Sequence, residues 1–248
     1  MAVLVTRPQP DDEATAASLR ARGLAVLKAP MLRFEPVAFQ EEADARYGAV
    51  IVTSANALRG LEPHLAGGRL LRLPLFAVGE RTASAARAAG FENVIPADGD
   101  GAALRDLVVE RVKTKQLKKA SPLLYLAGAD LARDLASELG ERGFTVATQT
   151  TYRMAPVANL PREACDAFAA HGIDAVLHYS RRSARAFLEA ARAGGVEISA
   201  LSVPQCCISE GVAAVVRDAG ATQVVVAAAP HENALFEALD RALRSQSR

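Results

Sequence analysis

The sequence lacks the residue patterns of metal sites and of disulfide frameworks. It has only three cysteines, Cys165, Cys206 and Cys207, and none is spaced as in a CxxC motif. The four histidines are scattered and form no HExxH motif. Structural zinc sites and disulfide scaffolds need closely spaced sets of such residues. We therefore predict no metal site, and we interpret the cysteines as reduced core residues of a cytoplasmic protein.

The sequence also lacks an excess of charge and a long apolar run. Its formal net charge is +1, whereas general nucleic-acid and membrane-surface binders usually show a basic excess. No apolar run approaches the roughly 20 residues that span a bilayer. The N-terminus has neither the charged head nor the apolar stretch of a signal peptide. We therefore expect a cytoplasmic protein with no nucleic-acid and no membrane partner.

The familiar catalytic motifs are missing as well. There is no GxxxxGK[ST] phosphate loop and no GxSxG elbow, and the segment from Gly99 to Gly101 lacks the third glycine of a dinucleotide fingerprint. His171 and His178 are interpreted as structural residues. Tyr125 and Tyr179 lie within apolar strand runs and are interpreted as core. The sequence therefore predicts a protein without a strong acid–base constellation.

What the sequence does contain is a long internal repeat. Residues 1–37 and 121–157 align without a gap, and each stretch reads as a buried strand, a loop, an amphipathic helix, a second strand and a linker. We call each copy block A. The matched pairs include Leu19 with Leu139, Arg22 with Arg142, Gly23 with Gly143, and Arg33 with Arg153.

The segments after each block A repeat too, so the order is A-B-C-A-B-C. Block B comprises residues 49–54 and 175–180, and block C comprises residues 76–97 and 206–227. Buried strands alternate with helical segments throughout, which is typical of parallel sheets covered on both faces. The pattern predicts two similar α/β domains. It leaves open whether each block A joins the B and C that follow it or those of the other half.

Small residues, hydroxyls and arginines recur between the predicted strands and helices. In open α/β sheets ligands bind outside the carboxyl ends of the strands, and helix N-termini there present free N–H groups that suit anions. Any single Ser, Thr or Gly at such a place can be a cap or turn residue, but the recurrence favours an anion-binding cleft. The segments are Thr6-Arg7, Thr53-Ser54, Gly79 to Thr82, Gly128-Ala129, Ser180 to Arg182, and Ser209 to Gly211.

Tyr152 stands apart because it lies in the linker that follows the second block A, next to Arg153. A tyrosine hydroxyl in a cleft can donate or accept a hydrogen bond. The alternative is that Tyr152 only packs at a hinge.

The ordered set of motifs resembles the uroporphyrinogen-III synthase family over essentially the whole chain. The motifs are VLVTRP, IVTSANAL, AVGERTASAARAAGF with ADGDGAAL, and LLYLAGADLARDLASELGERGF ending in TTYR. The resemblance implies two flavodoxin-like parallel-sheet domains joined by a two-stranded linker, with a cleft between them and with the first block A completing the second B and C. The resemblance implies that residues 1–34 and 157–248 form one domain, into which a second domain of residues 38–152 is inserted. The implied linker strands are residues 30–37 and 150–157.

The resemblance also implies a function in tetrapyrrole biosynthesis. Such an enzyme, a lyase, cyclises and dehydrates hydroxymethylbilane to uroporphyrinogen III with inversion of ring D, as a monomer without a cofactor. Tyr152 matches the family's candidate acid, and since a phenol is a weak acid at neutral pH, we expect hydrogen-bond assistance from it. Many members of the family have threonines at the positions that Gly211 and Val212 occupy in this sequence. The expected substrate-binding residues are Arg7, Ser54, Gly79, Thr82, Gly128, Ser180 and Ser209.

Two other functions compete with this interpretation. One is a two-domain protein that binds a small anionic ligand, which the missing signal peptide disfavours in a periplasmic form. The other is a transferase acting on a phosphorylated or polycarboxylate substrate, which the missing phosphate loop disfavours. Turnover of hydroxymethylbilane separates both from the enzyme.

Overall fold

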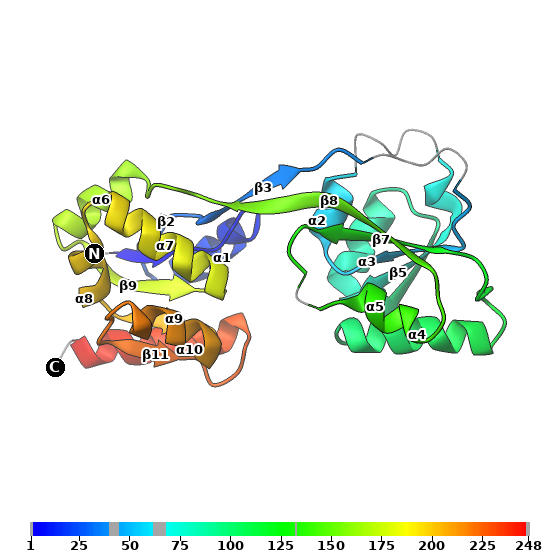
Figure 1. The fold of residues 1–248 in the computed structure, drawn as a ribbon. Helices are drawn as coiled ribbons and strands as arrows, with labels where there is room; N and C mark the ends of the chain where they lie inside the picture. Colours follow the sequence, from blue (N-terminus) through cyan, green and yellow to red (C-terminus); the bar gives the residue numbers. More distant parts are fainter. Residues whose placement is uncertain (1, 40–44, 62–67, 132, 247–248) are drawn as a thin grey trace. The chain divides into compact units, whose positions relative to one another are not determined.

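The chain forms two compact α/β units, and both unit boundaries fall inside strands. A computed structural model describes residues 2–39, 45–61, 68–131 and 133–246. Unit 1 comprises Met1–Arg33 with Ala155–Arg248, and unit 2 comprises Phe34–Met154 (Figure 1). The boundaries lie in β3 (Leu32–Pro36) and β8 (Val146–Pro156). None of the helices within the described ranges has the length and apolar character needed to cross a membrane.

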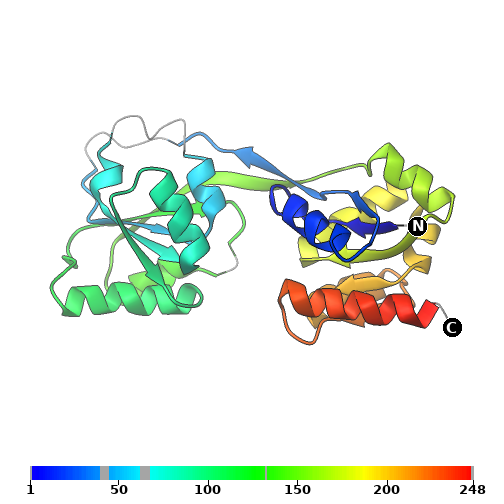
Figure 2. The same ribbon diagram turned by 180° about the vertical axis from the view of Figure 1, so that it is seen from behind.

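Unit 1 is built on a five-stranded parallel sheet in the order β11-β10-β9-β1-β2. Its strands are β1 (Ala2–Val5), β2 (Val26–Lys28), β9 (Ile173–His178), β10 (Gln205–Cys207) and β11 (Val224–Val226). Its helices are α1 (Asp11–Arg20), α6 (Arg162–Ala169), α7 (Arg181–Ala193), α8 (Glu197–Ser202), α9 (Glu210–Asp218) and α10 (Glu232–Gln246). Helices α7 and α9 cover one face of this sheet and α1 and α10 the other (Figures 1 and 2).

Unit 2 is built on a six-stranded sheet in the order β3-β8-β7-β4-β5-β6. Its remaining strands are β4 (Ala49–Val52), β5 (Pro74–Val78), β6 (Asn93–Ala97) and β7 (Leu123–Gly128). Its helices are α2 (Ala55–Arg59), α3 (Gly79–Ala88), α4 (Gly101–Lys113) and α5 (Leu135–Gly140), with a 3₁₀ turn at Leu70–Arg72. The strands from β4 to β8 pair in parallel.

The strand β3 runs antiparallel to β8 at the edge of this sheet. The Val37 amide donates to the Thr151 carbonyl at 2.9 Å, and the Val157 amide donates to the Met31 carbonyl at 3.0 Å. Because the residue number rises on one strand as it falls on the other, the two strands run in opposite directions.

The alternation of side chains along β4 explains how unit 2 is layered. Val50 and Val52 belong to an apolar cluster with residues of α2 and α3, whereas Ala49 and Ile51 belong to a second cluster with residues of α4 and α5. Successive side chains of a strand point to opposite faces, so a run that is apolar at every position is buried on both sides. This is the pattern expected from the sequence for a parallel sheet with covered faces.

The strand pairing decides between the two arrangements of block A that the residues left open. β1, from the first block A, pairs with β9, from the second block B. β7, from the second block A, pairs with β4, from the first block B. Each sheet then has the flavodoxin-like order, in which ligands bind at the switch point where the strand order reverses. That point lies between β1 and β9 in unit 1 and between β7 and β4 in unit 2.

The cysteines are free, as the sequence predicts, but they are not all core residues. Cys206 and Cys207 are fully buried in β10, whereas Cys165 in α6 is half-buried. Among the described residues, no group of three or more His, Cys, Asp or Glu side chains is arranged to hold a metal ion.

Candidate active site

A pocket of about 400 Å³ opens at the switch point of unit 2. Residues that follow β4 and β7 line it, together with the loop before α4 and one residue of β8, so it lies at the carboxyl ends of parallel strands, where α/β folds bind ligands. Three of the residues expected from the sequence, Tyr152, Ser54 and Gly128, lie in it. The full lining is Thr53, Ser54, Val78, Gly99, Asp100, Gly101, Tyr125, Gly128, Asp130, Leu131, Arg133, Leu135 and Tyr152.

The position of the Tyr152 ring depends on the absence of a side chain at Gly128. A Cβ atom at Gly128 would lie 2.6 Å from Cζ and 2.8 Å from the hydroxyl oxygen of Tyr152. The pairing of β7 with β8 also shifts register here: Ala127 is opposite Thr150 but Gly128 is opposite Tyr152. Such a bulge turns side chains away from the regular alternation, and here it accompanies a buried Thr151 whose hydroxyl donates to the Ala57 carbonyl at 2.9 Å.

A face of the Tyr152 ring is covered by an aromatic neighbour. Phe34 of β3 stacks on it with ring centroids 5.7 Å apart and an angle of 18° between the planes. Arg59 is the last residue of α2, and its guanidinium lies 4.5 Å from the centroid of the Phe34 ring. Offset stacking and a cation over a ring each stabilise an aromatic pair. Tyr152 is therefore held by its close approach to Gly128 and by its stacking on Phe34.

A second tyrosine hydroxyl reaches the same pocket. Tyr125 is 2% exposed and packs in the core of unit 2, as expected from the sequence. Its hydroxyl, however, lies 3.1 Å from the Thr53 hydroxyl at the end of β4. Burial raises the pKa of Tyr125, an effect that the hydrogen bond with Thr53 opposes. The sequence interpretation missed this hydroxyl because an apolar strand pattern reports where a ring is buried and not where its polar end lies.

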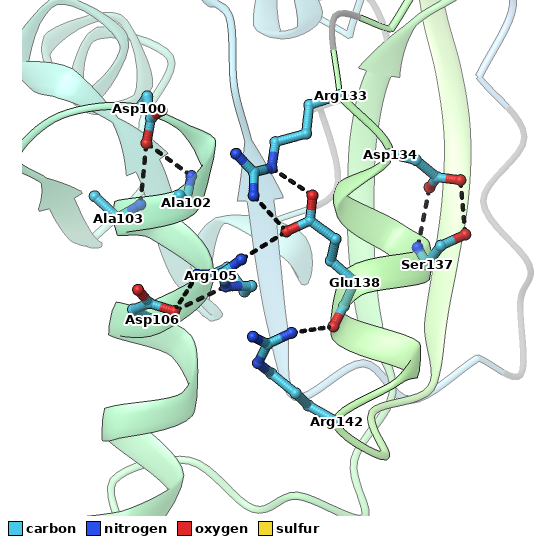
Figure 3. A network of polar contacts seen from close by, with 10 residues as sticks. All are labelled: Asp100, Ala102, Ala103, Arg105, Asp106, Arg133, Asp134, Ser137, Glu138 and Arg142. Atoms are coloured by element: carbon cyan, nitrogen blue, oxygen red, sulfur yellow. Dashed lines mark hydrogen bonds and ion pairs between the residues drawn. The ribbon is translucent and has the colours of Figure 1, made fainter.

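Three charged side chains line the pocket, and they come from the loops that precede α4 and α5: Asp100, Asp130 and Arg133. The Asp100 carboxylate accepts hydrogen bonds from the Ala102 amide at 2.8 Å and the Ala103 amide at 3.2 Å, so it caps α4. These bonds hold the pKa of Asp100 below its usual value, and the group is ionised at neutral pH. Arg133 is paired with Glu138 of α5 (Figure 3).

The switch point of unit 1 carries a different polar cluster, centred on Glu232 at the start of α10. One carboxylate oxygen of Glu232 accepts from Arg7 at 2.6 Å, from Thr15 at 2.5 Å and from Tyr179 at 3.2 Å. Arg7 also pairs with Asp11 at 3.2 Å. Burial and the Glu232 charge raise the pKa of Tyr179. Arg7, an expected substrate ligand, is thus already bound to two carboxylates of its own chain.

The remaining expected residues lie at helix starts. Ser54 and Ser180 cap α2 and α7, accepting from the Asn56 amide at 3.3 Å and the Ser183 amide at 3.0 Å. Ser209 precedes α9 and makes no capping hydrogen bond through its side chain. Gly79 begins α3 with φ +70°, and Thr82, 6% exposed, lies in the first turn of that helix.

His178 has the structural role expected from the sequence. Its Nε2 atom lies 2.8 Å from the Gln205 side-chain oxygen. The amide nitrogen of Gln205 donates to the carbonyls of Ala200 and Val203, so its oxygen must accept and Nε2 must carry the proton. Within the described part of the chain, Nδ1 has no partner. Burial lowers the pKa of His178 to about 4.

The pocket of unit 2 offers groups that can hold and orient a molecule with both polar and apolar parts, although Asp100 and Asp130 add two carboxylates to the lining. It offers the hydroxyls of Tyr152, Tyr125 and Thr53, the Arg133 guanidinium, and the apolar side chain of Leu131, which is 44% exposed. Hydroxyls and a guanidinium bind carboxylates and polarise oxygen atoms.

The comparisons with known proteins agree on one family. The family model described as uroporphyrinogen-III synthase HemD matches residues 13–237. The crystal structure of uroporphyrinogen-III synthetase from Helicobacter pylori is similar over 100% of this chain and 99% of that chain, with TM-score 0.64 and 17% identity. A mutant uroporphyrinogen III synthase from the extremely thermophilic bacterium Thermus thermophilus is similar over 99% of this chain and 100% of that chain, with TM-score 0.56 and 19% identity.

A comparison with individual curated sequences finds no match. At these identities the two structures establish the shared two-domain α/β fold, and the family model, which covers most of the chain, establishes the family. The chain therefore belongs to the uroporphyrinogen-III synthase family, and it is an enzyme of tetrapyrrole biosynthesis.

Proposed function

We propose that the protein converts hydroxymethylbilane to uroporphyrinogen III and that it acts as a cyclising hydro-lyase. The terminal hydroxyl leaves as water to give an azafulvene. The far pyrrole then attacks through its substituted carbon to form a spiro intermediate, and fragmentation followed by re-closure leaves ring D inverted. The pyrrole nitrogens supply the electrons for each step, so the reaction requires no cofactor. The family match carries this proposal.

The task that remains for the protein is orientation. Uncatalysed closure proceeds without inversion, so the enzyme must hold the flexible chain in the geometry that leads to attack at the substituted carbon, which is catalysis by positioning. A pocket that carries the hydroxyls of Tyr152, Tyr125 and Thr53 beside the Arg133 guanidinium supports that task. Donors fixed by the fold need little reorganisation when charge develops.

In this proposal Tyr152 donates a hydrogen bond to the departing hydroxyl group. The arrangement of Gly128, Tyr152 and Phe34 supports the role, because it fixes the phenol at the edge of the pocket. Loss of one such hydrogen bond, at about 1.4 kcal/mol, corresponds to roughly a tenfold lower turnover. Tyr152→Phe should show that loss with an unchanged melting temperature. An unchanged rate and isomer ratio would remove Tyr152 from the mechanism.

The substrate-binding set is also proposed from the sequence. Ser54, Gly79, Thr82 and Gly128 would serve the substrate from unit 2, and Arg7, Ser180 and Ser209 from unit 1. Arg7 would have to exchange Glu232 for a substrate carboxylate, since its guanidinium is bound to Glu232 at 2.6 Å.

Further parts of the proposal concern organisation. We propose that one domain comprises residues 1–34 with 157–248, that the other comprises residues 38–152, and that the strands 30–37 and 150–157 join them. We also propose that the protein is a monomer in solution. It would act in the cytoplasm on a small-molecule substrate, without nucleic-acid or membrane partners. Limited proteolysis, with cleavage expected first in the linker strands, tests the boundaries, and light scattering tests the monomer.

The deciding experiment is an assay with freshly made hydroxymethylbilane, followed by separation of the oxidised porphyrin isomers. Predominantly type III product is expected. Only type I product from folded protein would overturn the proposed reaction.

A further inference from the structure

Arg133 is held in place at the pocket by Glu138 and by Gly101. Its Nε atom pairs with one carboxylate oxygen of Glu138, and its Nη2 atom donates to the other at 2.8 Å (Figure 3). Its aliphatic stem rests on Gly101 at the start of α4, where an added Cβ would lie 3.3 Å from the Arg133 Cδ atom. A guanidinium fixed by a two-point ion pair loses less conformational freedom on binding than a free arginine.

Glu138 is itself fixed by a second arginine. The Nη1 atom of Arg105, in α4, donates to Glu138 at 2.9 Å, and the Arg105 side chain is only 17% exposed. Arg105 also pairs with Asp106 at 2.7 Å. The Arg105–Glu138 ion pair thus bridges α4 and α5 beside the apolar contacts of Leu104 and Leu139. The Glu138 carboxylate is consequently ionised, and the two arginines hold its pKa below the usual value.

The geometry of the ion pair leaves one edge of the Arg133 guanidinium available. A guanidinium has five N–H donors, and Glu138 accepts from Nε and Nη2. The second edge is formed by Nη1 and the other hydrogen of Nη2. Among the residues that the structure describes, no acceptor is bonded to Nη1. Two parallel N–H groups at such an edge match the two oxygens of a carboxylate.

Asp100 does not compete for that edge through a hydrogen bond. Its carboxylate accepts from the amides of Ala102 and Ala103 at the start of α4, and it attracts Arg133 only through space. The pocket next to Arg133 also contains the Tyr152 ring and the exposed side chain of Leu131. A carboxylate attached to a flat, largely apolar ring can therefore satisfy the guanidinium and the apolar surface together.

We propose that Arg133 binds one carboxylate of the linear tetrapyrrole through its Nη1–Nη2 edge and that Glu138, held by Arg105, is the positioning residue that aims this edge at the pocket. The proposal rests on the proposed function and adds to it a substrate contact in unit 2. The alternative is that the Arg133–Glu138 ion pair is only structural. The Arg133 side chain is 39% exposed, and exposed ion pairs contribute little to stability, so that alternative predicts small changes in stability and none in substrate binding.

The first test is Arg133→Gln in the bilane assay. Because hydrogen bonds to charged groups are worth about 1.5–3 kcal/mol, we expect KM for hydroxymethylbilane to rise roughly 10- to 100-fold, with a smaller change in kcat. Arg142→Gln is the matched control: Arg142 donates to the Glu138 main-chain carbonyl at 2.9 Å and lies outside the pocket lining. It removes the same charge and should leave KM within about twofold, because Arg142 does not line the pocket. A similar KM rise in both variants would overturn the carboxylate contact.

The second test separates the positioning role from a structural one. Glu138→Gln should raise KM by a smaller factor than Arg133→Gln, and it should add nothing in an Arg133→Gln background, because Glu138 acts only through Arg133. Additive effects would overturn the positioning role. Arg133→Lys, which keeps the charge but loses the two-point edge, should retain the melting temperature and show most of the KM rise; a wild-type KM in this variant would overturn the proposed geometry.

The wild-type protein is assayed in parallel. Type III product from the wild type together with an unchanged KM in Arg133→Gln would overturn this inference alone. Absence of type III product from the wild type would overturn the proposed function and this inference with it.

Discussion

Replacing Gly128 with alanine tests whether Tyr152 must lie where the structure places it. The alanine Cβ would lie 2.6 Å from Cζ and 2.8 Å from the hydroxyl oxygen of Tyr152. Carbon atoms in contact prefer about 3.5–4.0 Å, so the ring must move by roughly 1 Å. The stacked Phe34 ring closes one direction of movement. Alanine removes no polar group, so any loss of activity reports the position of Tyr152.

The expected loss follows from the size of this displacement. A misplacement of about 1 Å at a reacting centre can cost on the order of 100-fold in rate, and removal of the Tyr152 hydroxyl should cost about tenfold. We therefore expect Gly128→Ala to lower kcat for type III product roughly 10- to 100-fold, because the displaced ring also enters the pocket. Crowding of this kind costs about 1–3 kcal/mol of folding stability, and the half-buried ring favours the lower end.

The assay is formation of type III product from hydroxymethylbilane, with thermal unfolding measured on the same samples. Gly140→Ala is the matched control, because a Cβ there has no neighbour within 4 Å. Gly140 ends α5, so alanine should leave kcat unchanged and change stability by less than about 1 kcal/mol.

A double variant provides the refutation. In a Tyr152→Ala background the clashing ring is absent, so Gly128→Ala should have no further effect on rate or stability. Full activity of the single variant Gly128→Ala, or a further loss in the Tyr152→Ala background, would show that Gly128 does not fix the catalytic geometry.

Three further predictions concern separate parts of the fold. His178 has a folded-state pKa of about 4, whereas the ordinary pKa of histidine is 6.5. Between pH 6.5 and pH 4 the unfolded chain therefore binds a proton at His178 that the folded chain does not. The free energy of unfolding should fall by roughly 3 kcal/mol as the pH drops from 6.5 to 4. His178→Gln should flatten that part of a plot of melting temperature against pH. Gly60→Ala should destabilise the protein by about 3 kcal/mol in urea unfolding, since its Cβ would lie 2.1 Å from the Thr151 carbonyl oxygen. Thr151→Val should cost about 1–2 kcal/mol, because the Ala57 carbonyl loses its donor at 2.9 Å.

Each of these predictions has a distinct contrary result. An unchanged pH dependence in His178→Gln would mean that another group carries the acid sensitivity. A normal melting temperature in Gly60→Ala would mean that α2 and β8 can separate at little cost. A neutral Thr151→Val would mean that the bulge in β8 does not need its side-chain hydrogen bond.

Much of the architecture could be predicted from the sequence because it depends on local patterns of apolar and polar residues. The buried strands are continuous apolar runs, as at Val50 and Ile51, and parallel sheets covered by helices require such runs. The family could also be predicted, since its motifs occur in order along the whole chain, and the family match confirms it. Ser54, Gly128 and Tyr152 were expected near a site because they follow strands or lie in the linker, and they line one pocket.

Other features depended on contacts between distant residues. Tyr125 was correctly interpreted as core, but its hydroxyl meets Thr53 from a different strand, and no spacing along the chain reports that. No sequence pattern indicated the role of Arg133. It pairs with Glu138, five residues later, whereas ion pairs within a helix are usually three or four residues apart. The spacing differs because Arg133 precedes the first residue of α5. Arg7 was expected from the sequence to bind substrate, and only the fold brings Glu232 to it.

By itself the sequence determined the repeat, the fold class, the missing metal and nucleotide motifs, and the family, because each of these follows from the order and spacing of residues along the chain. The residue pattern left open which block A joins which sheet; the family resemblance implied the exchanged arrangement, and the strand pairing shows it. Only the tertiary structure decided how Gly128 and Phe34 fix Tyr152 and which arginine faces the pocket of unit 2. The two copies of block A have the same strand pattern, so local preferences cannot distinguish their partners. Pairing β1 with β9 and β7 with β4 requires contacts between distant segments, and such contacts are selected by the packing of the whole chain.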